Sequence, residues 1–250
     1  MIILKSPHEI DLMRQSGKIS ARALKLAGEA VEPGVTTEKL DEIARKYIES
    51  QGAVPSFLGY NGFPKSSCIS INNEVIHGIP SSKRIIKSGD IVSIDVGAYI
   101  NGFHGDNAWT FPCGDITKEA RNLLKATRES LFKAISVAKV GNRIGDIGNV
   151  VEEYAKVRGY SVVRNFVGHG VGASMHEDPS VPNFGKPGRG ARLREGMTIA
   201  IEPMVNKGVS KIRVLNDNWT VVTVDGKLSA HFEHTIAITS DGPLILTDPS

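Results

Sequence analysis

Two aspartates in one apolar hairpin constrain this 250-residue chain more than any other feature. The dipeptide Asn101-Gly102 is a strong signal for a two-residue turn between antiparallel strands. Such a turn places Gly97 opposite Asp106. Asp95 lies two residues from Gly97 and therefore shares its face of the strand. We expect the two carboxylates to be diagonal neighbours, with Cα atoms roughly 7–8 Å apart unless a bulge changes the register.

This pair of carboxylates needs a compensating charge. Like charges repel each other, and burial removes the water that would screen them. Residues 90–106, which form the predicted hairpin, contain no lysine or arginine. A metal cation is therefore a natural partner, although the hairpin alone is equally consistent with Asp106 being a polar residue at its end.

Three further segments carry an acid or a histidine where a structural residue would be apolar. Glu202 ends a β-like run, Glu233 lies within another, and His169 stands among three glycines that allow close backbone approach. Four carboxylates and one imidazole suit hard or borderline cations such as Mn, Fe, Co or Zn. Four negative charges would balance two divalent ions. The set predicts a two-metal site that activates water against a carbonyl or phosphoryl group.

The bulk properties exclude several classes of protein. The 30 basic and 27 acidic residues give a net charge of only +3, and the basic residues are scattered, which argues against a nucleic-acid site. Cys68 and Cys113 form no CxxC motif or disulfide framework, which indicates a reducing compartment. The start of the chain is too short an apolar stretch for a signal peptide, and no run approaches the ~20 apolar residues of a membrane span. We expect a cytoplasmic protein without membrane contact.

Capping signals predict four helices. They start at Ser6-Pro7, at Thr36 or Thr37, at Thr117 and near Gly145. The remainder of the chain is expected to be rich in strands, with Asp225-Gly226 as a second hairpin turn. No linker divides the sequence, so residues 1–250 are predicted to form a single domain.

The two halves of the chain resemble each other at a constant offset. Residues 87–95 match residues 194–202 in type, and 194 − 87 = 107. The same offset pairs Leu24 with Leu131, Gly34 with Gly141 and Tyr47 with Tyr154. This pattern predicts two helix–helix–strand copies, at about 16–95 and 123–202, with Asp95 and Glu202 on opposite sides of a central site. The alternative is that amphipathic helices simply look alike.

Seven short motifs, in order along the chain, complete this picture. They are Cys68-Ile69-Ser70-Ile71-Asn72, His77-Gly78-Ile79-Pro80, Asp95-Val96-Gly97, Gly168-His169-Gly170-Val171-Gly172, His176-Glu177, Ala200-Ile201-Glu202-Pro203 and Glu233-His234-Thr235. With these motifs the chain resembles the type I methionine aminopeptidases over almost its whole length. The implied fold is the pita-bread α/β (α+β) fold, a pseudo-twofold antiparallel sheet backed by two helix pairs. The interval between His169 and Glu233, 233 − 169 = 64 positions, leaves no space for the helical insertion of the type II branch.

The resemblance implies a role for each candidate residue of the metal site. The ligands would be Asp95, Asp106, His169, Glu202 and Glu233, and they would hold two divalent metal ions (Mn, Fe, Co or Zn). Asp95 and Glu233 would bridge both ions, whereas His169 would bind one. Glu202 would also move a proton from the nucleophilic water to the leaving amine.

The resemblance also implies how the substrate is held. His77 and His176 would contact the scissile amide and stabilise the developing oxyanion. The methionine pocket would be lined by Tyr60, Phe63, Cys68 and Trp219, with His77 at its edge. Taken one by one, these residues could equally be ordinary polar or core side chains. Asn61, Phe63 and Met175 differ from residues often found at these places in the family, so the detailed pocket shape stays open.

The activity implied by the resemblance is removal of the N-terminal methionine from nascent proteins when the next residue is small. The partners would be the N-termini of nascent polypeptides, a monomer is expected, and contact with the ribosome is left open. The nearest alternative is an aminopeptidase P or prolidase-like enzyme on the same fold, which cleaves before proline and usually carries a further N-terminal domain. A non-catalytic binding protein on this fold would be expected to have lost metal ligands.

Overall fold

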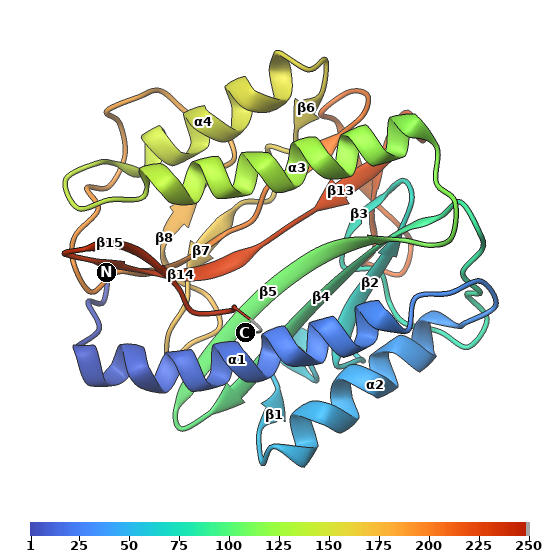
Figure 1. Cartoon of the computed structure of the whole chain (residues 1–250), viewed down its shortest axis with the longest axis horizontal. Coiled ribbons are helices and arrows are strands. Elements are labelled where there is room, and N and C mark those ends of the chain that lie inside the picture. The colour runs from blue at the N-terminus through green and yellow to red at the C-terminus, as the bar shows by residue number, and fades with distance from the viewer. Residues whose placement is uncertain (249–250) are drawn as a thin grey trace.

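The computed structural model describes residues 1–248 and shows two pairs of helices packed against a layer of strands (Figure 1). Within these residues the α-helices are α1 (Pro7–Glu29), α2 (Thr37–Ser50), α3 (Lys118–Val137) and α4 (Ile144–Lys156), with a short 3₁₀ turn η1 (Tyr60–Gly62). Helices α1 and α2 lie along one side of the view, α3 and α4 lie along the other, and the strands run between the two pairs. No helix in residues 1–248 is both long and apolar enough to cross a membrane.

Within residues 1–248 the strands pair antiparallel in four sheets. Their bounds are β1 (Val54–Pro55), β2 (Ser67–Ile71), β3 (Glu74–Ile76), β4 (Ile91–Ile100), β5 (Phe103–Pro112), β6 (Ser161–Val162), β7 (Gly168–Gly170), β8 (Glu177–Val181), β9 (Thr198–Ile201), β10 (Met204–Asn206), β11 (Ile212–Val214), β12 (Val221–Thr223), β13 (Ser229–His231), β14 (His234–Thr239) and β15 (Gly242–Ile245). The larger sheets are β1-β4-β2 with β5 on β4, and β15-β14-β9-β7-β8. Two smaller ones are β13-β10-β6 and β11-β12-β3.

The helices start where the capping signals predict. The Ser6 hydroxyl accepts a hydrogen bond from the Glu9 backbone N–H, and the Glu9 carboxylate accepts one from the Ser6 backbone N–H, which completes a capping box. Thr36 caps α2 and Thr117 caps α3 through their side-chain oxygens. Helix α4 starts at Ile144, one residue before the predicted position.

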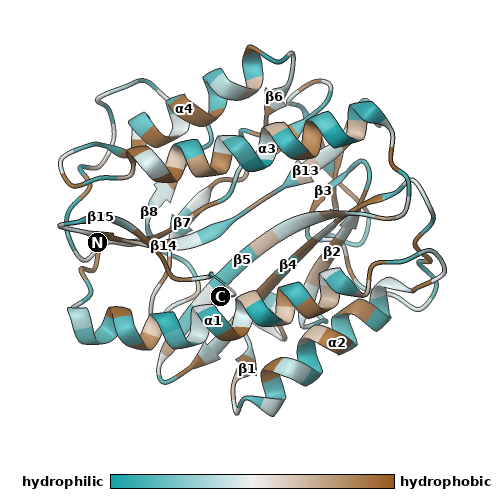
Figure 2. Cartoon of the chain, viewed as in Figure 1, coloured by the Kyte–Doolittle hydropathy of each residue, from teal (hydrophilic) through white to brown (hydrophobic). Residues whose placement is uncertain are grey.

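Each helix pair buries an apolar face against its own set of strands. Leu24 of α1 and Leu40 of α2 share one buried cluster with Ile94 of β4. Leu131 of α3 and Ile199 of β9 belong to a second cluster in the other half. Figure 2 shows the mixture of hydrophilic and hydrophobic residues along each helix that an amphipathic helix presents. Full burial of a large aliphatic side chain contributes roughly 1.5–3 kcal/mol, so these two layers stabilise the positions of the central strands.

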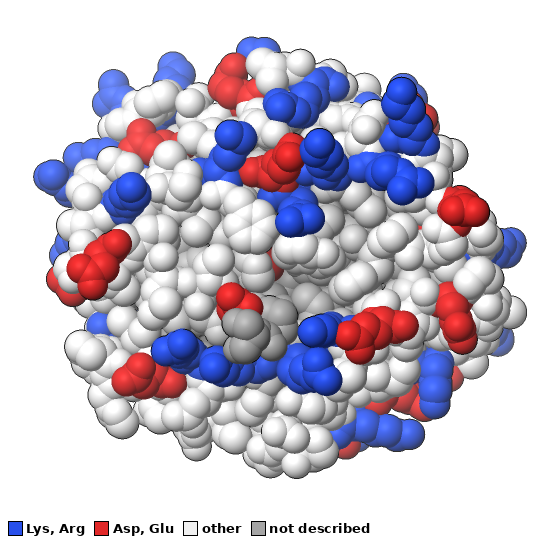
Figure 3. Space-filling model, in the orientation of Figure 1, with Lys and Arg blue, Asp and Glu red and all other residues white. Residues whose placement is uncertain are grey.

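On the face that carries the helices, charges of both signs are spread out, and neither sign forms a single large patch. Figure 3 shows Lys and Arg interspersed with Asp and Glu along the helix pairs, whereas the central part of this face is mostly uncharged. This distribution fits the small net charge of +3.

The predicted hairpin register is confirmed. Gly97 pairs with Asp106 and Asp95 pairs with Ala108 across β4 and β5. Asn101 and Gly102 have φ angles of 54° and 85°, the positive values that a type I′ turn requires. The turn chemistry therefore sets which residues of β5 face the carboxylate of Asp95.

The second predicted hairpin is wrong. The chain does turn after Thr223, but β12 pairs with β11 and β3, whereas β13 pairs with β10. The Asp225 carboxylate accepts hydrogen bonds from the backbone N–H groups of Val209 and Lys227 instead. The turn therefore passes the chain from one sheet to another rather than folding it back on itself.

Candidate metal centre

One cavity of about 380 Å³ brings together every residue that the sequence predicts for the site. Its walls include the predicted ligands Asp95, Asp106, His169, Glu202 and Glu233, the histidines His77 and His176, and the pocket residues Tyr60, Phe63, Cys68 and Trp219. The volume is within the usual range for sites that bind small molecules. Predicted side chains that are up to 173 positions apart in the sequence thus face one space (233 − 60, from Tyr60 to Glu233).

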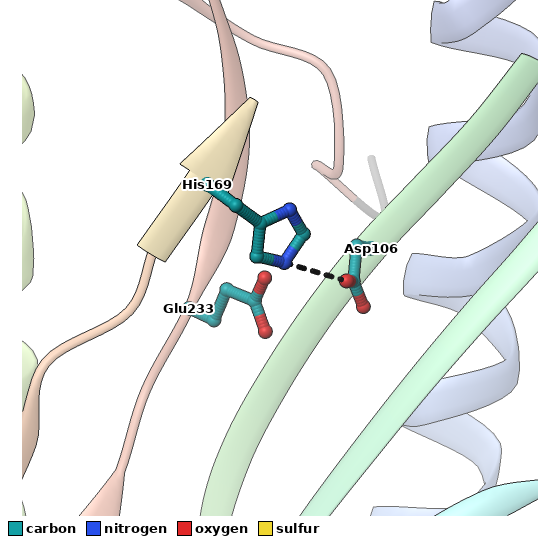
Figure 4. A group of neighbouring side chains, drawn as sticks. All are labelled: Asp106, His169 and Glu233. Atoms are coloured by element: carbon teal, nitrogen blue, oxygen red, sulfur yellow. Dashed lines mark ion pairs between the residues drawn. The ribbon is translucent and has the colours of Figure 1, made fainter. Parts of the chain in front are cut away.

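The predicted ligands come from separate elements. Asp95 lies in β4, Asp106 in β5 and His169 at the centre of β7. Glu202 directly follows β9, and Glu233 lies between β13 and β14. Figure 4 shows Asp106, His169 and Glu233 pointing toward one another from three segments of the chain.

The glycines beside His169 allow the neighbouring backbones to come close. A Cβ atom on Gly168 would lie 2.4 Å from the carbonyl oxygen of Ala200, and one on Gly170 would lie 2.3 Å from that of Asp178. Both distances are too short for any side chain. Only glycine therefore lets β7 lie close enough to its neighbours to bring His169 to the carboxylates.

Glu202 and Glu233 lie where two paired strands are interrupted side by side. Strand β9 pairs with β14, β10 pairs with β13, and each glutamate lies in the break between two of these strands. The Glu233 N–H donates to the carbonyl oxygen of Ala108 at 2.8 Å, and the Asn183 side chain donates to the carbonyl oxygen of Glu202 at 3.0 Å. The expectation that Glu233 lies within a strand is wrong, because at this point its N–H bonds to β5 rather than to β9.

The side-chain atoms of the cluster are close together. His169 Nε2 lies 3.7 Å from Asp106 Oδ2 and 3.8 Å from Glu202 Oε1. Ligand atoms of Asp106, His169 and Glu233 lie within 4.8 Å of one another. His169 Nδ1 lies 2.9 Å from the carbonyl oxygen of Gly170. A carbonyl oxygen can only accept a hydrogen bond, so Nδ1 is the donor. Nδ1 therefore carries a proton, and in the neutral ring the lone pair of Nε2 faces the carboxylates, as in metal-binding histidines.

Three carboxylate oxygens of this cluster are buried without a hydrogen-bond partner in residues 1–248: Asp95 Oδ1, Asp106 Oδ1 and Glu233 Oε1. Burial, with a further contribution from the charge of Glu202, raises the pKa of Asp95 to about 7. Burial and neighbouring carboxylates also raise the pKa values of Asp106 and Glu233 well above their usual range. Unpaired buried carboxylates each cost several kcal/mol. A divalent cation would provide the missing partner, so the residues present fit a metal with mostly oxygen ligands and one nitrogen ligand.

The two predicted oxyanion histidines border the carboxylate cluster. His176 Nδ1 lies 2.8 Å from the Tyr60 hydroxyl, and its ring centroid lies 4.0 Å from that of His169. Burial lowers the pKa of His176 to about 4. Burial likewise lowers the pKa of His77 to about 4. Both rings are therefore neutral near pH 7, and each can donate one N–H to a substrate oxygen.

An apolar pocket adjoins these histidines. Phe57, Phe63, Cys68 and Met175 form a buried cluster, and Tyr60, Ile79 and Trp219 pack against it. The ring centroids of Phe63 and Trp219 lie 5.0 Å apart in an edge-to-face arrangement. Burial raises the pKa of the Cys68 thiol well above its usual range, which suits a lining residue rather than a nucleophile.

Several residues of this region were not predicted from the sequence, among them Phe57, Phe166 and His231. Phe57 and Phe166 line the cavity, and neither belongs to a motif that marks it. His231 is buried beside two of the carboxylates, with Nε2 3.5 Å from Glu202 Oε2 and 4.0 Å from Glu233 Oε2. Its position two residues before Glu233, in an otherwise apolar segment, was a signal that could have identified it.

Comparisons with known proteins agree with this geometry. The chain is 58% identical over 247 residues to a methionine aminopeptidase of Clostridium perfringens, with 99% of each sequence covered. Its structure matches a solved methionine aminopeptidase of Thermotoga maritima with a TM-score of 0.98 at 45% identity, covering 99% of this chain and 100% of that one. A prolidase of Pyrococcus horikoshii matches with a TM-score of 0.79 at 26% identity, covering 100% of this chain and 65% of that one.

These likenesses confirm the pita-bread fold expected from the sequence. The sequence model of metallopeptidase family M24 matches residues 11–240, which is most of the chain. The chain therefore belongs to the metallopeptidase family M24.

Proposed function

We propose that this protein hydrolyses the first peptide bond of polypeptides that begin with methionine followed by a small residue. The observation that carries the proposal is a cluster of carboxylates and neutral histidines that opens onto an apolar pocket in one cavity. Relatives that share 45–58% of their residues with this chain over nearly its whole length are methionine aminopeptidases by name.

The metal would be held by Asp95, Asp106, His169, Glu202 and Glu233. We propose two divalent ions, of Mn, Fe, Co or Zn, because four carboxylates balance two double charges. Bound there, they would polarise the scissile carbonyl and lower the pKa of a water molecule. The orphaned oxygens of Asp95, Asp106 and Glu233 support this assignment.

Glu202 is the carboxylate that we assign to proton transfer. Its side chain keeps 11% of its surface exposed, compared with 2% for Glu233, so a substrate can approach it more easily. A carboxylate in this position can accept a proton from the attacking water and release it to the leaving amine. The side-chain bond from Asn183 to its carbonyl oxygen keeps its backbone in place.

His77 and His176 would stabilise the negative charge that develops on the scissile carbonyl oxygen. Their pKa values of about 4 keep both rings neutral near pH 7. When the Tyr60 hydroxyl donates to Nδ1 of His176, the Nε2–H of that ring is free to donate to substrate. A preorganised donor of this kind typically contributes a factor of ~10²–10³ to kcat.

The apolar pocket would hold the methionine side chain. Sulfur interacts favourably with aromatic rings, and Tyr60, Phe63 and Trp219 provide three of them. Met175 and Cys68 add polarisable sulfur atoms that adapt to an unbranched side chain. Pocket and carboxylates share one cavity, so a side chain held in the pocket places the adjacent peptide bond near the cluster.

We further propose that the catalytic unit is one domain over residues 1–250, built from two copies offset by 107 positions. Helix α2 (Thr37–Ser50) shifted by 107 would span 144–157, and α4 spans Ile144–Lys156. These bounds support the repeat. The substrates would be nascent polypeptides in the cytoplasm, and the enzyme would act as a monomer, with ribosome contact left open.

The decisive experiment compares peptides under metal-loaded conditions. The purified chain, titrated with Mn, Fe, Co or Zn, should release free methionine from Met-Ala-Ser and leave an Ala-Pro peptide intact. Cleavage of the Ala-Pro peptide alone would show the prolidase-like activity of the more distant structural neighbour. Absence of turnover with every metal, despite measured metal binding, would indicate a non-catalytic protein and refute the proposal.

A further inference from the structure

His231 is a buried histidine that the proposed mechanism does not use. It ends β13, pairs with Met204 of β10 and is only 2% exposed. Its Nε2 atom lies 3.5 Å from Glu202 Oε2 and 4.0 Å from Glu233 Oε2. Within residues 1–248, this nitrogen has no hydrogen-bond partner. Buried polar atoms are nearly always hydrogen-bonded, so this one calls for an explanation.

The backbone, and not the ring, fixes the position of His231. Its N–H donates to Thr110 Oγ1 at 2.9 Å, and the same hydroxyl donates to the His231 carbonyl oxygen at 2.8 Å. Thr110 Oγ1 also lies 2.8 Å from Ser93 Oγ, which ties the arrangement to β4. The ring is therefore presented to the carboxylates by a rigid support. A histidine needed only for packing would not leave a nitrogen unpaired toward two acids.

Glu202 has a different nitrogen near each of its oxygens. Oε1 faces His169 Nε2 at 3.8 Å, and Oε2 faces His231 Nε2 at 3.5 Å. The carbonyl oxygen of Gly170 takes the Nδ1 proton of His169, so in the neutral ring it is a lone pair on Nε2 that faces Glu202. His231 is then the nearby ring that can offer Glu202 a donor. An N–H···O bond needs about 2.7–3.2 Å, and a small rotation of the Glu202 side chain would close the gap.

We propose that His231 is a positioning residue, whose Nε2–H donates to Glu202 Oε2 and fixes the orientation of that carboxylate. His231 itself touches neither substrate nor reacting atoms in this role. The inference rests on the proposed function, because it takes Glu202 as the residue that moves the proton. Outer partners of this kind orient a ligand, and their loss typically costs 10–100-fold in metal affinity or activity.

The test compares His231→Gln with His231→Asn and His231→Leu. The amide nitrogen of glutamine reaches about as far from the backbone as Nε2 of histidine, whereas that of asparagine reaches only as far as Nδ1. Leucine removes the donor. For Met-Ala-Ser, the Leu and Asn variants should lose ~10–100-fold in kcat with KM changed less than about threefold, and Gln should recover most of kcat.

A readout independent of turnover is Mn²⁺ binding followed by calorimetry. The Leu and Asn variants should bind Mn²⁺ about tenfold more weakly or worse, whereas Gln should stay close to the unchanged protein. His234→Leu is the matched control, since this buried histidine is in the same region but bonds to Thr247 Oγ1 at 2.9 Å. Its Mn²⁺ affinity should not change, even if its melting temperature falls.

The outcomes separate the inference from the function on which it rests. Failure of the unchanged protein to release methionine would refute the proposed function. A Leu variant with unchanged kcat and Mn²⁺ affinity would overturn the role of His231. Equal losses of kcat and Mn²⁺ affinity in the Gln and Asn variants would overturn it too. A residue that only fills space would not depend on the position of its hydrogen-bond donor. If the Leu variant does not fold, the contrast between Gln and Asn still decides the question.

Discussion

The carboxylate cluster makes the metal-free protein less stable as pH rises. Burial and the charge of Glu202 raise the pKa of Asp95 in the folded chain to about 7, whereas its ordinary value is 3.8. A carboxylate whose pKa is raised by folding binds its proton more tightly in the folded state than in the unfolded state. Its contribution is favourable below the unfolded pKa and is lost as pH rises through the folded pKa. The pH window for Asp95 is therefore about 4 to 7.

The size of this effect follows from the two pKa values. Through linkage, Asp95 alone lowers the free energy of unfolding by about 2 kcal/mol at pH 5.5 and by about 4 kcal/mol at pH 7.5, relative to low pH where it is protonated in both states. The difference of about 2 kcal/mol corresponds to roughly 4–8 °C in Tm for a chain of this size. Asp106 and Glu233 shift in the same direction, so they reinforce the trend.

Metal should reverse this loss. A divalent ion at 100 times its Kd stabilises the folded state by about 2.7 kcal/mol, and protons compete with it for the same carboxylates. Thermal melts with and without Mn²⁺ should therefore show a larger rise in Tm at pH 7.5 than at pH 5.5. The metal-free protein should melt higher at pH 5.5 than at pH 7.5.

Two variants make the measurement specific. Asp106→Asn removes one charge from the cluster and should reduce the pH dependence of the metal-free Tm. Asp11→Asn changes an exposed aspartate on α1 and should leave that dependence unchanged. The reasoning is refuted if Mn²⁺ binds at pH 7.5 without raising Tm, because these carboxylates would then not share one site.

Three further predictions concern turnover. Asp106→Ala should abolish release of methionine from Met-Ala-Ser and weaken Mn²⁺ binding in calorimetry, because it removes a buried anionic oxygen from the cluster; near-normal activity would reject this ligand assignment. His176→Ala should lower kcat by ~10²–10³-fold with Mn²⁺ content unchanged, and a change mainly in KM would mean that the ring does not stabilise the transition state. Steady-state kinetics should give a much higher kcat/KM for Met-Ala than for Met-Leu peptides, since bulky second residues should overlap the cavity wall; comparable values would contradict the proposed specificity.

Local turn and cap chemistry is what made much of the fold predictable. Asn101-Gly102 adopts the positive φ angles that this dipeptide tolerates, and this local conformation alone sets the pairing of Gly97 with Asp106. Ser6 and Thr117 likewise mark helix starts through bonds to residues three positions away. Each of these signals depends only on a few residues that are neighbours in the sequence, so it can be recognised without knowledge of the fold.

The predictions that were wrong concern segments whose conformation depends on residues far away in the sequence. Asp225-Gly226 carries the same kind of turn signal as Asn101-Gly102, yet the strands beside it pair with different neighbours. Glu233 lies in an apolar run that resembles a strand, but its N–H bonds to Ala108, 125 positions earlier (233 − 108). No local pattern states which sheet a segment joins. Phe57 reaches the cavity for the same reason, through packing that its own neighbours in sequence do not reveal.

The site combines two ways of fixing a charged side chain. Asp95 and Asp106 lie in long paired strands, where the hairpin register determines the position of each carboxylate. Glu202 and Glu233 lie where the paired strands break, and single bonds from Asn183 and to Ala108 replace the missing ladder. Breaks of this kind free a glutamate from the alternation of a strand, so that it can reach toward a site between the sheets. A glutamate at such a break is not oriented by the strand and needs a separate partner to orient its carboxylate. His231 lies where it can orient Glu202.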